Sequence, residues 1–562
     1  AVMNWVGGVN VPEAAGNLML QGGIPTEAIA EGGVIKRFQL EHVWVEAWID
    51  YAPSRGEKHI AGDSWVPMDA SYKQYDYNDG MDLATEVPFD AQGLADTITA
   101  QSTINEAEGW VQGVPQTQVE AALTDYDAQI ELYLTQQAPD ATVAEVLGTR
   151  GIKTVVQEAL ASTLPYPLLI RKLVVSELGD DLRWKFRYVL SKNVSGTIGA
   201  ELLSMKRPTV ALAGQKLSLS FRPATQADEE LLTGYLPKVD ANGEIDSEAI
   251  SDTLPGYLIK LSGEFALGDS IVASTSGNVA MGEPLVSGMG YWQPGRGWLT
   301  TRNEPVAGEF RAISLCLQGI SESQVVDVEK KLSETRRKIS NEDYSDISRQ
   351  DLIGDMLFSV MMDYFVLNDA QDEVDGLQAN SLGYRSPSYG IFKTILKPSY
   401  SYGVAFTVSA LGVGMDVDRL NNIRVDRDNN LERWRAFNLH QGFRMSLLES
   451  HIPEIKYSRD SAPISSVSAT KAMYIAARQG QRLWAIDQSN VDYALSALEF
   501  NETLEGDIRR AVLSGKQVSI HSQPLVVNGE RVFGYIIVDP ETGGGAYRIS
   551  TGENGSYLGG LF

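Results

Sequence analysis

Two neighbouring stretches decide how the start of this chain folds: His42-Val43-Trp44-Val45-Glu46-Ala47-Trp48 and Asp63-Ser64-Trp65-Val66-Pro67-Met68-Asp69. In the first stretch Val43 and Val45 alternate with polar or aromatic residues, and a period of two is typical of a β-strand. Turn-forming residues at 52–56 favour a hairpin. We therefore predict that His42 and Asp69 form a hydrogen bond across neighbouring strands. We expect the indoles of Trp44, Trp48 or Trp65 to shield it.

A carboxylate on an imidazole fixes the tautomer of the ring and stabilises the imidazolium, as in a nucleophilic triad. The pattern resembles the transglutaminase-like branch of the papain-like cysteine hydrolases, whose His-Val-Trp-x-Glu and Asp-x-Trp-x-x-x-Asp motifs carry the catalytic His and Asp. The resemblance implies that His42 is the catalytic base and Asp69 its orienting acid. It assigns supporting positions to four further residues: Trp44, Glu46, Asp63 and Trp65.

The nucleophile of such a triad is missing from the expected place. Residues 1–41 contain neither Cys nor Ser, and Thr26 is the only hydroxyl residue there. The single cysteine, Cys316, lies in an apolar strand, where a small buried hydrophobe is the expected role. Two interpretations stay open: the thiol lies on an upstream segment of the same precursor, or the His–Asp contact is kept without its chemistry. In both, the chain is the downstream piece of a longer polypeptide.

The composition narrows the class of protein. The chain has 562 residues, of which 43% are hydrophobic, and a net charge of −26. This charge argues against binding nucleic acid or an anionic membrane, since phosphate contacts need a basic surface. No apolar stretch is long enough to span a bilayer, and no signal peptide is evident. One cysteine excludes an intrachain disulfide and fits either a cytosolic protein or a large secreted bacterial one.

The succession of patterns predicts a multidomain α+β protein with a partial transglutaminase-like α+β domain, helical connectors, a β-sandwich-like domain and a C-terminal α+β unit. The strand at 182–190 places a basic stripe on its outer face, which a solvated surface explains more simply than a binding face does. The expected parts are the C-terminal half of a transglutaminase-like domain at 1–92, a helical connector at 93–163, the β-sandwich-like domain at 164–319, a helical hairpin at 320–376, a strand-rich segment at 377–462 and the C-terminal unit at 463–562.

No cofactor or metal is expected. The acidic loop at 240–251 lacks the glycine and the final glutamate of a calcium loop, and the aspartates at 416–428 are interleaved with arginines. His521 and Asp539 repeat the pattern of a strand His followed by a strand Asp, and we interpret that repeat as structural.

Over its whole length the chain resembles large bacterial transglutaminase-like proteins that carry Rhs-type repeats or polymorphic-toxin modules. This resemblance implies a secreted or cell-surface bacterial protein, with a downstream repeat or toxin module as a further partner. The implied function is a scaffold or carrier segment. The alternative is the larger fragment of a cysteine amidase or acyltransferase.

Overall fold

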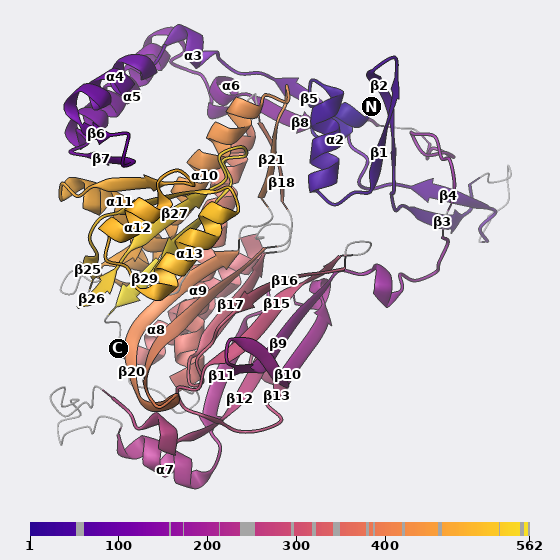
Figure 1. Cartoon of the computed structure of the whole chain (residues 1–562). Coiled ribbons are helices and arrows are strands. Elements are labelled where there is room, and N and C mark those ends of the chain that lie inside the picture. Colours follow the sequence, from indigo (N-terminus) through magenta and orange to yellow (C-terminus); the bar gives the residue numbers. More distant parts are fainter. Residues whose placement is uncertain are drawn as a thin grey trace.

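The computed structural model describes a mixed helix-and-sheet chain built from several sheets, as expected for a multidomain α+β protein (Figure 1). The described residues are 1–51, 61–156, 159–171, 173–212, 214–235, 253–293, 297–316, 322–340, 349–377, 381–385, 388–418, 422–458, 464–527, 529–550 and 556–559. The expected turn at 52–56 and the acidic loop at 240–251 therefore lie outside them. None of the helices in these ranges combines the length and the apolar character that crossing a lipid bilayer requires.

The N-terminal unit contains two helices that the sequence did not lead us to expect. Helix α1 (Val2–Trp5) is followed by α2 (Pro12–Gln21), which begins with a proline at its first position, where a missing N–H costs nothing. The buried face of α2 packs against Leu382 and Val425 in a core with the following members: Val9, Ala14, Ala15, Leu18 and Met19. Part of this core is thus supplied by residues far downstream in the same chain.

Three antiparallel strand pairs lie in or next to the N-terminal unit. Strands β1 (Thr26–Glu31) and β2 (Val34–Leu40) form the first pair. Strands β3 (Val45–Ile49) and β4 (Ser64–Met68) form the predicted hairpin, with Val45 opposite Met68 and Trp48 opposite Trp65. Distant strands β18 (Ser381–Arg385) and β21 (Asn422–Asp426) form the third pair, which packs on α2.

A long excursion, which we call the strap (79–148), leaves this unit and returns to it. Strand β5 (Tyr75–Asn78) at its start pairs with β8 (Thr149–Ile152) at its end. Its helices are α3 (Leu83–Glu86), α4 (Ala91–Gln101), α5 (Gln116–Gln137) and α6 (Val143–Leu147). Helices α5 and α6 lie within the expected connector at 93–163, whereas α3 precedes it and α4 begins before it. At its far end a hairpin of β6 (Thr103–Asn105) and β7 (Trp110–Gln112) pairs with the C-terminal sheet (Figure 1).

The sandwich consists of a four-stranded and a longer sheet that enclose one apolar core. The first sheet has the order β10 (Thr197–Pro208), β9 (Lys185–Val194), β15 (Leu285–Gln293) and β16 (Gly297–Asn303). The second runs through β13 (Ser270–Ser274), β12 (Lys260–Leu267), β11 (Leu217–Pro223), β17 (Arg311–Cys316), β19 (Ser388–Ser401), β20 (Val404–Asp418), β29 (Ser556–Gly559) and β22 (Ser466–Ser468), with β14 (Val279–Ala280) beside β12. The expected boundary at residue 319 therefore falls within a continuous sheet. A short helix, α7 (Gln226–Gly234), follows β11.

Three long helices pack on the extended sheet. The expected helical hairpin at 320–376 is formed by α8 (Glu322–Ser340) and α9 (Arg349–Leu377). The segment at 377–462 was expected to be strand-rich, and this is wrong for its second half, which is the 27-residue helix α10 (Leu431–Tyr457). Its buried face includes Gln441, Ser446 and Glu449, so it lacks the apolar stripe that marks a helix in sequence. Met361 and Met445 meet in the core beneath these helices.

The C-terminal unit agrees closely with the expected pattern. Ser468 caps α11 (Ala469–Arg478), and β23 (Leu483–Ile486), α12 (Val491–Ala497) and α13 (Glu502–Leu513) follow. Strands β24 (Gln517–His521), β27 (Gly534–Val538) and β28 (Gly545–Ile549) complete the sheet, with a small hairpin of β25 (Leu525–Val527) and β26 (Glu530–Val532) inserted between them.

Candidate functional site

The predicted contact between His42 and Asp69 is present. His42 lies just before β3 and Asp69 just after β4, so both flank the same end of the antiparallel hairpin. The His42 Nε2 atom is 2.8 Å from the Asp69 Oδ2 atom. The carboxylate is buried, with 3% of its side chain exposed, and the imidazole is 20% exposed. We call these two residues the dyad.

Four hydrogen bonds reach the Asp69 carboxylate. Oδ2 accepts from His42 and from the hydroxyl of Tyr166 at 2.8 Å, while Oδ1 accepts from the backbone N–H and the hydroxyl of Ser71 at 2.9 and 2.7 Å. Burial raises the pKa of Asp69, but the bonds from Ser71, Tyr166 and His42 together outweigh it, and the net pKa is lowered. Burial and the bond to Asp69 raise the pKa of the Tyr166 phenol. Asp69 is therefore held as an anion with its acceptor positions filled.

Three aromatic rings other than the expected indoles surround the dyad. Trp5 meets the His42 ring edge-on with centroids 5.0 Å apart, and Tyr166 does so at 5.8 Å. Tyr72 packs against both of these rings at 5.2 and 5.6 Å. The indole of Trp5 also donates to the backbone carbonyl of Ser71. The shield of the dyad thus comes from segments before and after the hairpin.

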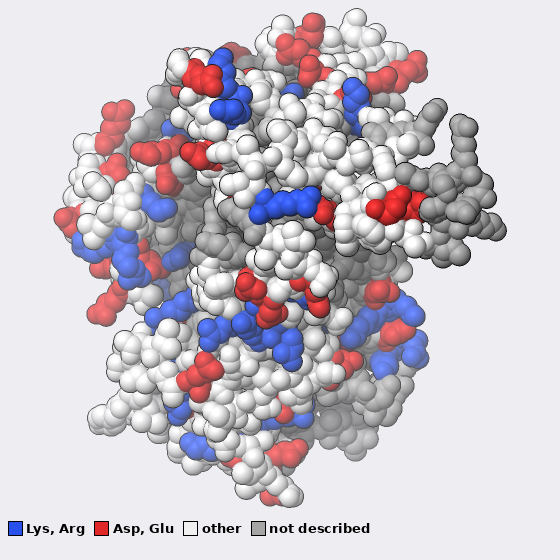
Figure 2. Space-filling view, turned by 90° about the vertical axis from the view of Figure 1, so that its right-hand side faces the viewer, with Lys and Arg blue, Asp and Glu red and all other residues white. Residues whose placement is uncertain are grey.

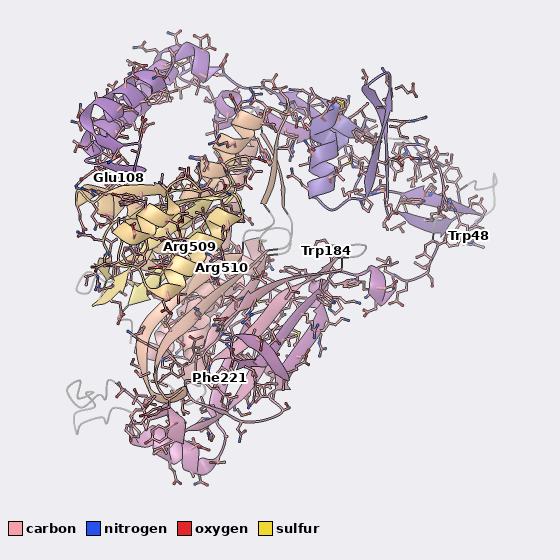
Figure 3. All side chains as sticks on the ribbon, viewed as in Figure 1. Trp48, Glu108, Trp184, Phe221, Arg509 and Arg510 are labelled. Atoms are coloured by element: carbon pink, nitrogen blue, oxygen red, sulfur yellow. The ribbon has the colours of Figure 1, made fainter. Side chains whose placement is uncertain are left out.

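The expectation that Trp44, Trp48 or Trp65 shields the dyad is wrong. Trp48 lies six positions beyond His42, which is about 20 Å along an extended strand. It packs against Trp65 at 5.4 Å, and both indoles are more than half exposed. Figure 3 shows Trp48 at the outer edge of the N-terminal unit. The indole of Trp44 donates instead to Glu46, at 3.2 Å.

The remaining supporting residues, Glu46 and Asp63, make other contacts. Glu46 forms an ion pair with Arg171 at 2.6 Å, which ties the hairpin to the segment that leads into the sandwich. Asp63 accepts from the backbone N–H of Tyr51 at 2.8 Å and so closes the base of the loop between β3 and β4. Neither carboxylate forms a described hydrogen bond to His42.

No nucleophile accompanies the dyad among the described residues. Cys316 ends β17 and is buried in the core beneath α9, with Leu357 and Met361. Thr26 donates its hydroxyl to the carbonyl of Ile24. The hydroxyl of Ser71 is 3.3 Å from His42, but it approaches Nε2, the nitrogen that Asp69 already occupies. With Nε2 donating to Asp69, Nδ1 is the nitrogen that could accept a proton.

Sequence reasoning missed Ser71, Tyr166 and Trp5. The triplet Asp69-Ala70-Ser71 has the spacing of an Asx turn, in which a carboxylate accepts the N–H two residues on, so Ser71 carried a local signal. Trp5 and Tyr166 are 37 and 97 positions from their contacts with the dyad, and nothing local marks them.

The second His–Asp pattern is a structural one, as expected. His521 is fully buried; Nδ1 lies 2.7 Å from the carbonyl oxygen of Gln523, and Nε2 accepts from the N–H of Gly534 at 2.9 Å. Burial lowers its pKa to about 4. Asp539 accepts from the N–H groups of Glu541 and Thr542 in a turn of its own.

No group of His, Cys, Asp and Glu side chains within the described ranges has an arrangement that could hold a metal ion. Asp426 and Asp428 form ion pairs with Arg433 at 2.9 and 2.7 Å, which agrees with the ion-pair interpretation of that cluster. Comparison of the chain with models of known protein families, with curated proteins and with solved structures gives no match. The argument for a function therefore depends on the geometry alone.

Proposed function

We propose that this chain is a non-catalytic scaffold or carrier module of a large secreted or surface bacterial protein. In it, a transglutaminase-like His–Asp pair holds chain segments together instead of activating a thiol. The observation that carries the proposal is the set of four hydrogen bonds on Asp69, because their donors come from three separate segments. The Asp69 carboxylate thus joins three segments of the chain, and we call this set of contacts the junction.

The aromatic rings support the same role. Trp5 brings the end of α1 to the dyad, and Tyr166 brings the segment that leads into the sandwich. Removing one partner of a buried hydrogen-bonded group costs about 1–3 kcal/mol, so each donor adds to the cohesion of the junction. A module that links an upstream segment of its precursor to a downstream repeat or toxin module requires such cohesion.

The second candidate function is a split cysteine amidase or acyltransferase. It is favoured by the Nδ1 atom of His42, which makes no hydrogen bond within the described part of the chain. The imidazole ring is also partly exposed. A thiol from an upstream segment could give its proton to Nδ1 and attack a glutamine carboxamide. Ammonia would leave as the thioester forms, and an amine or water would then resolve the thioester.

An amine-incorporation assay on glutamine peptides separates the two candidates. It compares the wild type, His42→Ala and Cys316→Ala, with circular dichroism as the check on folding. The scaffold proposal expects no turnover above background in any of the three, because an imidazole–carboxylate pair without a nucleophile forms no acyl intermediate.

Three outcomes would contradict the scaffold. Turnover that both substitutions abolish would identify Cys316 as the nucleophile and require β17 to reach the hairpin. Turnover that only His42→Ala abolishes would indicate activated water. A thiol-bearing upstream segment could also be added to the assay. If the wild type and Cys316→Ala then gain turnover and His42→Ala does not, the split enzyme is favoured.

A further inference from the structure

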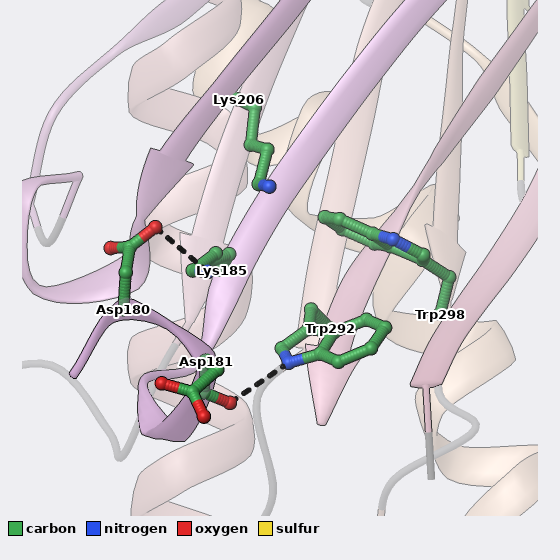
Figure 4. A pocket seen from close by; sticks show the side chains of 6 residues that line it. All are labelled: Asp180, Asp181, Lys185, Lys206, Trp292 and Trp298. Carbon is green, nitrogen blue, oxygen red and sulfur yellow. Dashed lines mark hydrogen bonds and ion pairs between the residues drawn. The ribbon is translucent and has the colours of Figure 1, made fainter. Parts of the chain in front are cut away.

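A surface hollow of about 430 Å³ lies on the four-stranded sheet of the sandwich, far along the chain from the dyad (Figure 4). Its volume is within the range of small-molecule sites. The side chains that line it come from the start of β9, from β10, β15 and β16, and from the turn before β9: Asp180, Asp181, Lys185, Lys206, Trp292 and Trp298. The hollow is independent of the proposed scaffold function.

The register of the strands explains why the hollow has aromatic walls. Lys185 of β9 lies opposite Trp292 of β15, which lies opposite Trp298 of β16. One row further along the same face, Arg187 lies opposite Gly290, so β15 contributes no side chain there. The two indoles are 5.6 Å apart with their planes inclined by 60°. The Trp292 indole donates to the carbonyl of Asp181 at 3.3 Å, which fixes its orientation.

Two cations lie over the indole of Trp298. The Lys206 ammonium is 5.7 Å from the centre of the Trp298 ring, and the Arg187 guanidinium is 6.0 Å from it. Lys185 is committed to Asp180, at 2.9 Å. Lys206 forms no ion pair within 4 Å with a described residue, although its charge helps to lower the pKa of Asp180; its ammonium is therefore not bound by a carboxylate and can contact a ligand. In Figure 2 blue side chains lie beside red ones in the lower half of the face, so basic residues are present there although the chain is acidic.

We propose that this hollow binds an acidic saccharide, with a hexuronate ring against Trp298 and its carboxylate paired with Lys206. The C–H face of a pyranose packs on an indole, and the two inclined rings suit successive sugar units. The carboxylate of Asp181 can accept hydrogen bonds from sugar hydroxyls, and so can the Oδ1 atom of Asp180, since Oδ2 contacts Lys185. The carboxylates of Asp180 and Asp181 would repel a polyphosphate chain, because a protein binds such a chain by neutralising each phosphate that it contacts.

Isothermal titration calorimetry on the whole chain tests the site with trigalacturonate and, as the neutral comparison, maltotriose. We expect trigalacturonate to bind about tenfold more tightly than maltotriose and to weaken with added salt. Trp298→Ala should weaken binding of both sugars about tenfold, because the stacking surface is lost. Lys206→Gln should remove only the preference for the acidic sugar.

Matched variants control for general effects. Trp48→Ala removes an exposed indole of the N-terminal unit, and Lys260→Gln removes an exposed lysine from the other sheet of the sandwich; both should leave the affinity unchanged. Three results would overturn the proposal. The first is no heat of binding at millimolar trigalacturonate, and the second is a preference for trigalacturonate over maltotriose that survives Lys206→Gln. The third is a short single-stranded oligonucleotide that binds as tightly as trigalacturonate and whose binding Trp298→Ala abolishes.

Discussion

The hairpin at His42 and the hairpin at His521 have the same pattern in sequence and opposite outcomes in space. In both, a histidine stands at one end of a strand and an aspartate directly follows the strand that pairs with it. In the first, Val45 pairs with Met68, so His42 and Asp69 flank one end of the hairpin. In the second, Gln517 pairs with Val538 and Ile520 with Tyr535, so His521 and Asp539 lie at opposite ends. His42 precedes its strand and His521 ends its strand, and in an antiparallel pair this position decides whether the two side chains meet.

The two imidazoles also differ in their partners. His42 has a carboxylate partner that is held as an anion, whereas His521 has only backbone partners and full burial, which favour the neutral ring. A histidine and a following aspartate on paired strands therefore predict a contact only where both residues lie at the same end of the antiparallel pair.

The largest expected effect is the pH dependence of the C-terminal unit. His521 titrates near pH 4 when folded and near its ordinary value of 6.5 when unfolded. Between these values the unfolded chain binds the extra proton, so stability is full above pH 6.5 and falls as the pH drops towards 4, by roughly 3 kcal/mol. Amide exchange of β24 and β27 across this range measures the loss. His521→Gln should flatten the curve and His42→Gln should not; an unchanged slope in His521→Gln would refute the assignment.

A smaller effect is expected from removing each aspartate. Asp69→Ala leaves three side-chain donors without their acceptor, and we expect a local loss of about 2 kcal/mol in the β3–β4 hairpin. Asp539→Ala, the matched change, loses two backbone hydrogen bonds and a contact with the Thr542 side chain within one local turn, and should cost about 1 kcal/mol or less. Exchange rates of the two hairpins give both values. Equal losses would mean that the dyad is not a junction.

The lowered pKa of Asp69 predicts at which pH the N-terminal hairpin loses stability, relative to the C-terminal hairpin. Because that pKa is lowered in the folded chain, the stability it contributes is present above the ordinary value of 3.8 and is lost as the pH falls through the folded value. Acid should therefore loosen the C-terminal hairpin first and the N-terminal hairpin at lower pH. Exchange followed from pH 7 to pH 3 shows the order, and Asp69→Asn should abolish the second step alone.

The smallest effect is expected at Tyr166. Tyr166→Phe removes one hydrogen bond to Asp69 and keeps the ring, so we expect a loss of about 1 kcal/mol, confined to the hairpin and the segment leading into the sandwich. Tyr72→Phe is the control, because its hydroxyl makes no hydrogen bond to a described residue. A similar loss in both variants would assign the effect to ring packing.

How far the sequence predicted this structure depends on the range of the contacts involved. The C-terminal helices and strands carry their caps and periods locally, and the structure confirms them. The contact between His42 and Asp69 followed from one hairpin. Helix α10 was missed because its buried face includes Glu449 and Ser450, whose burial depends on distant packing. Trp5 and Tyr166 reach the dyad through tertiary contacts that no local pattern records.

The strap has a consequence for the order in which this protein can be made. Strand β7 leaves the ribosome early, but its partner β23 is synthesised more than 370 residues later, since Trp110 pairs with Trp484. At the usual pace of bacterial and eukaryotic ribosomes this delay is about 20 to 75 s. For that time the edge of the hairpin, with the indole of Trp110 that Arg482 later covers at 4.2 Å, has no sheet to join. We expect this edge to stay unpaired until β23 has been synthesised.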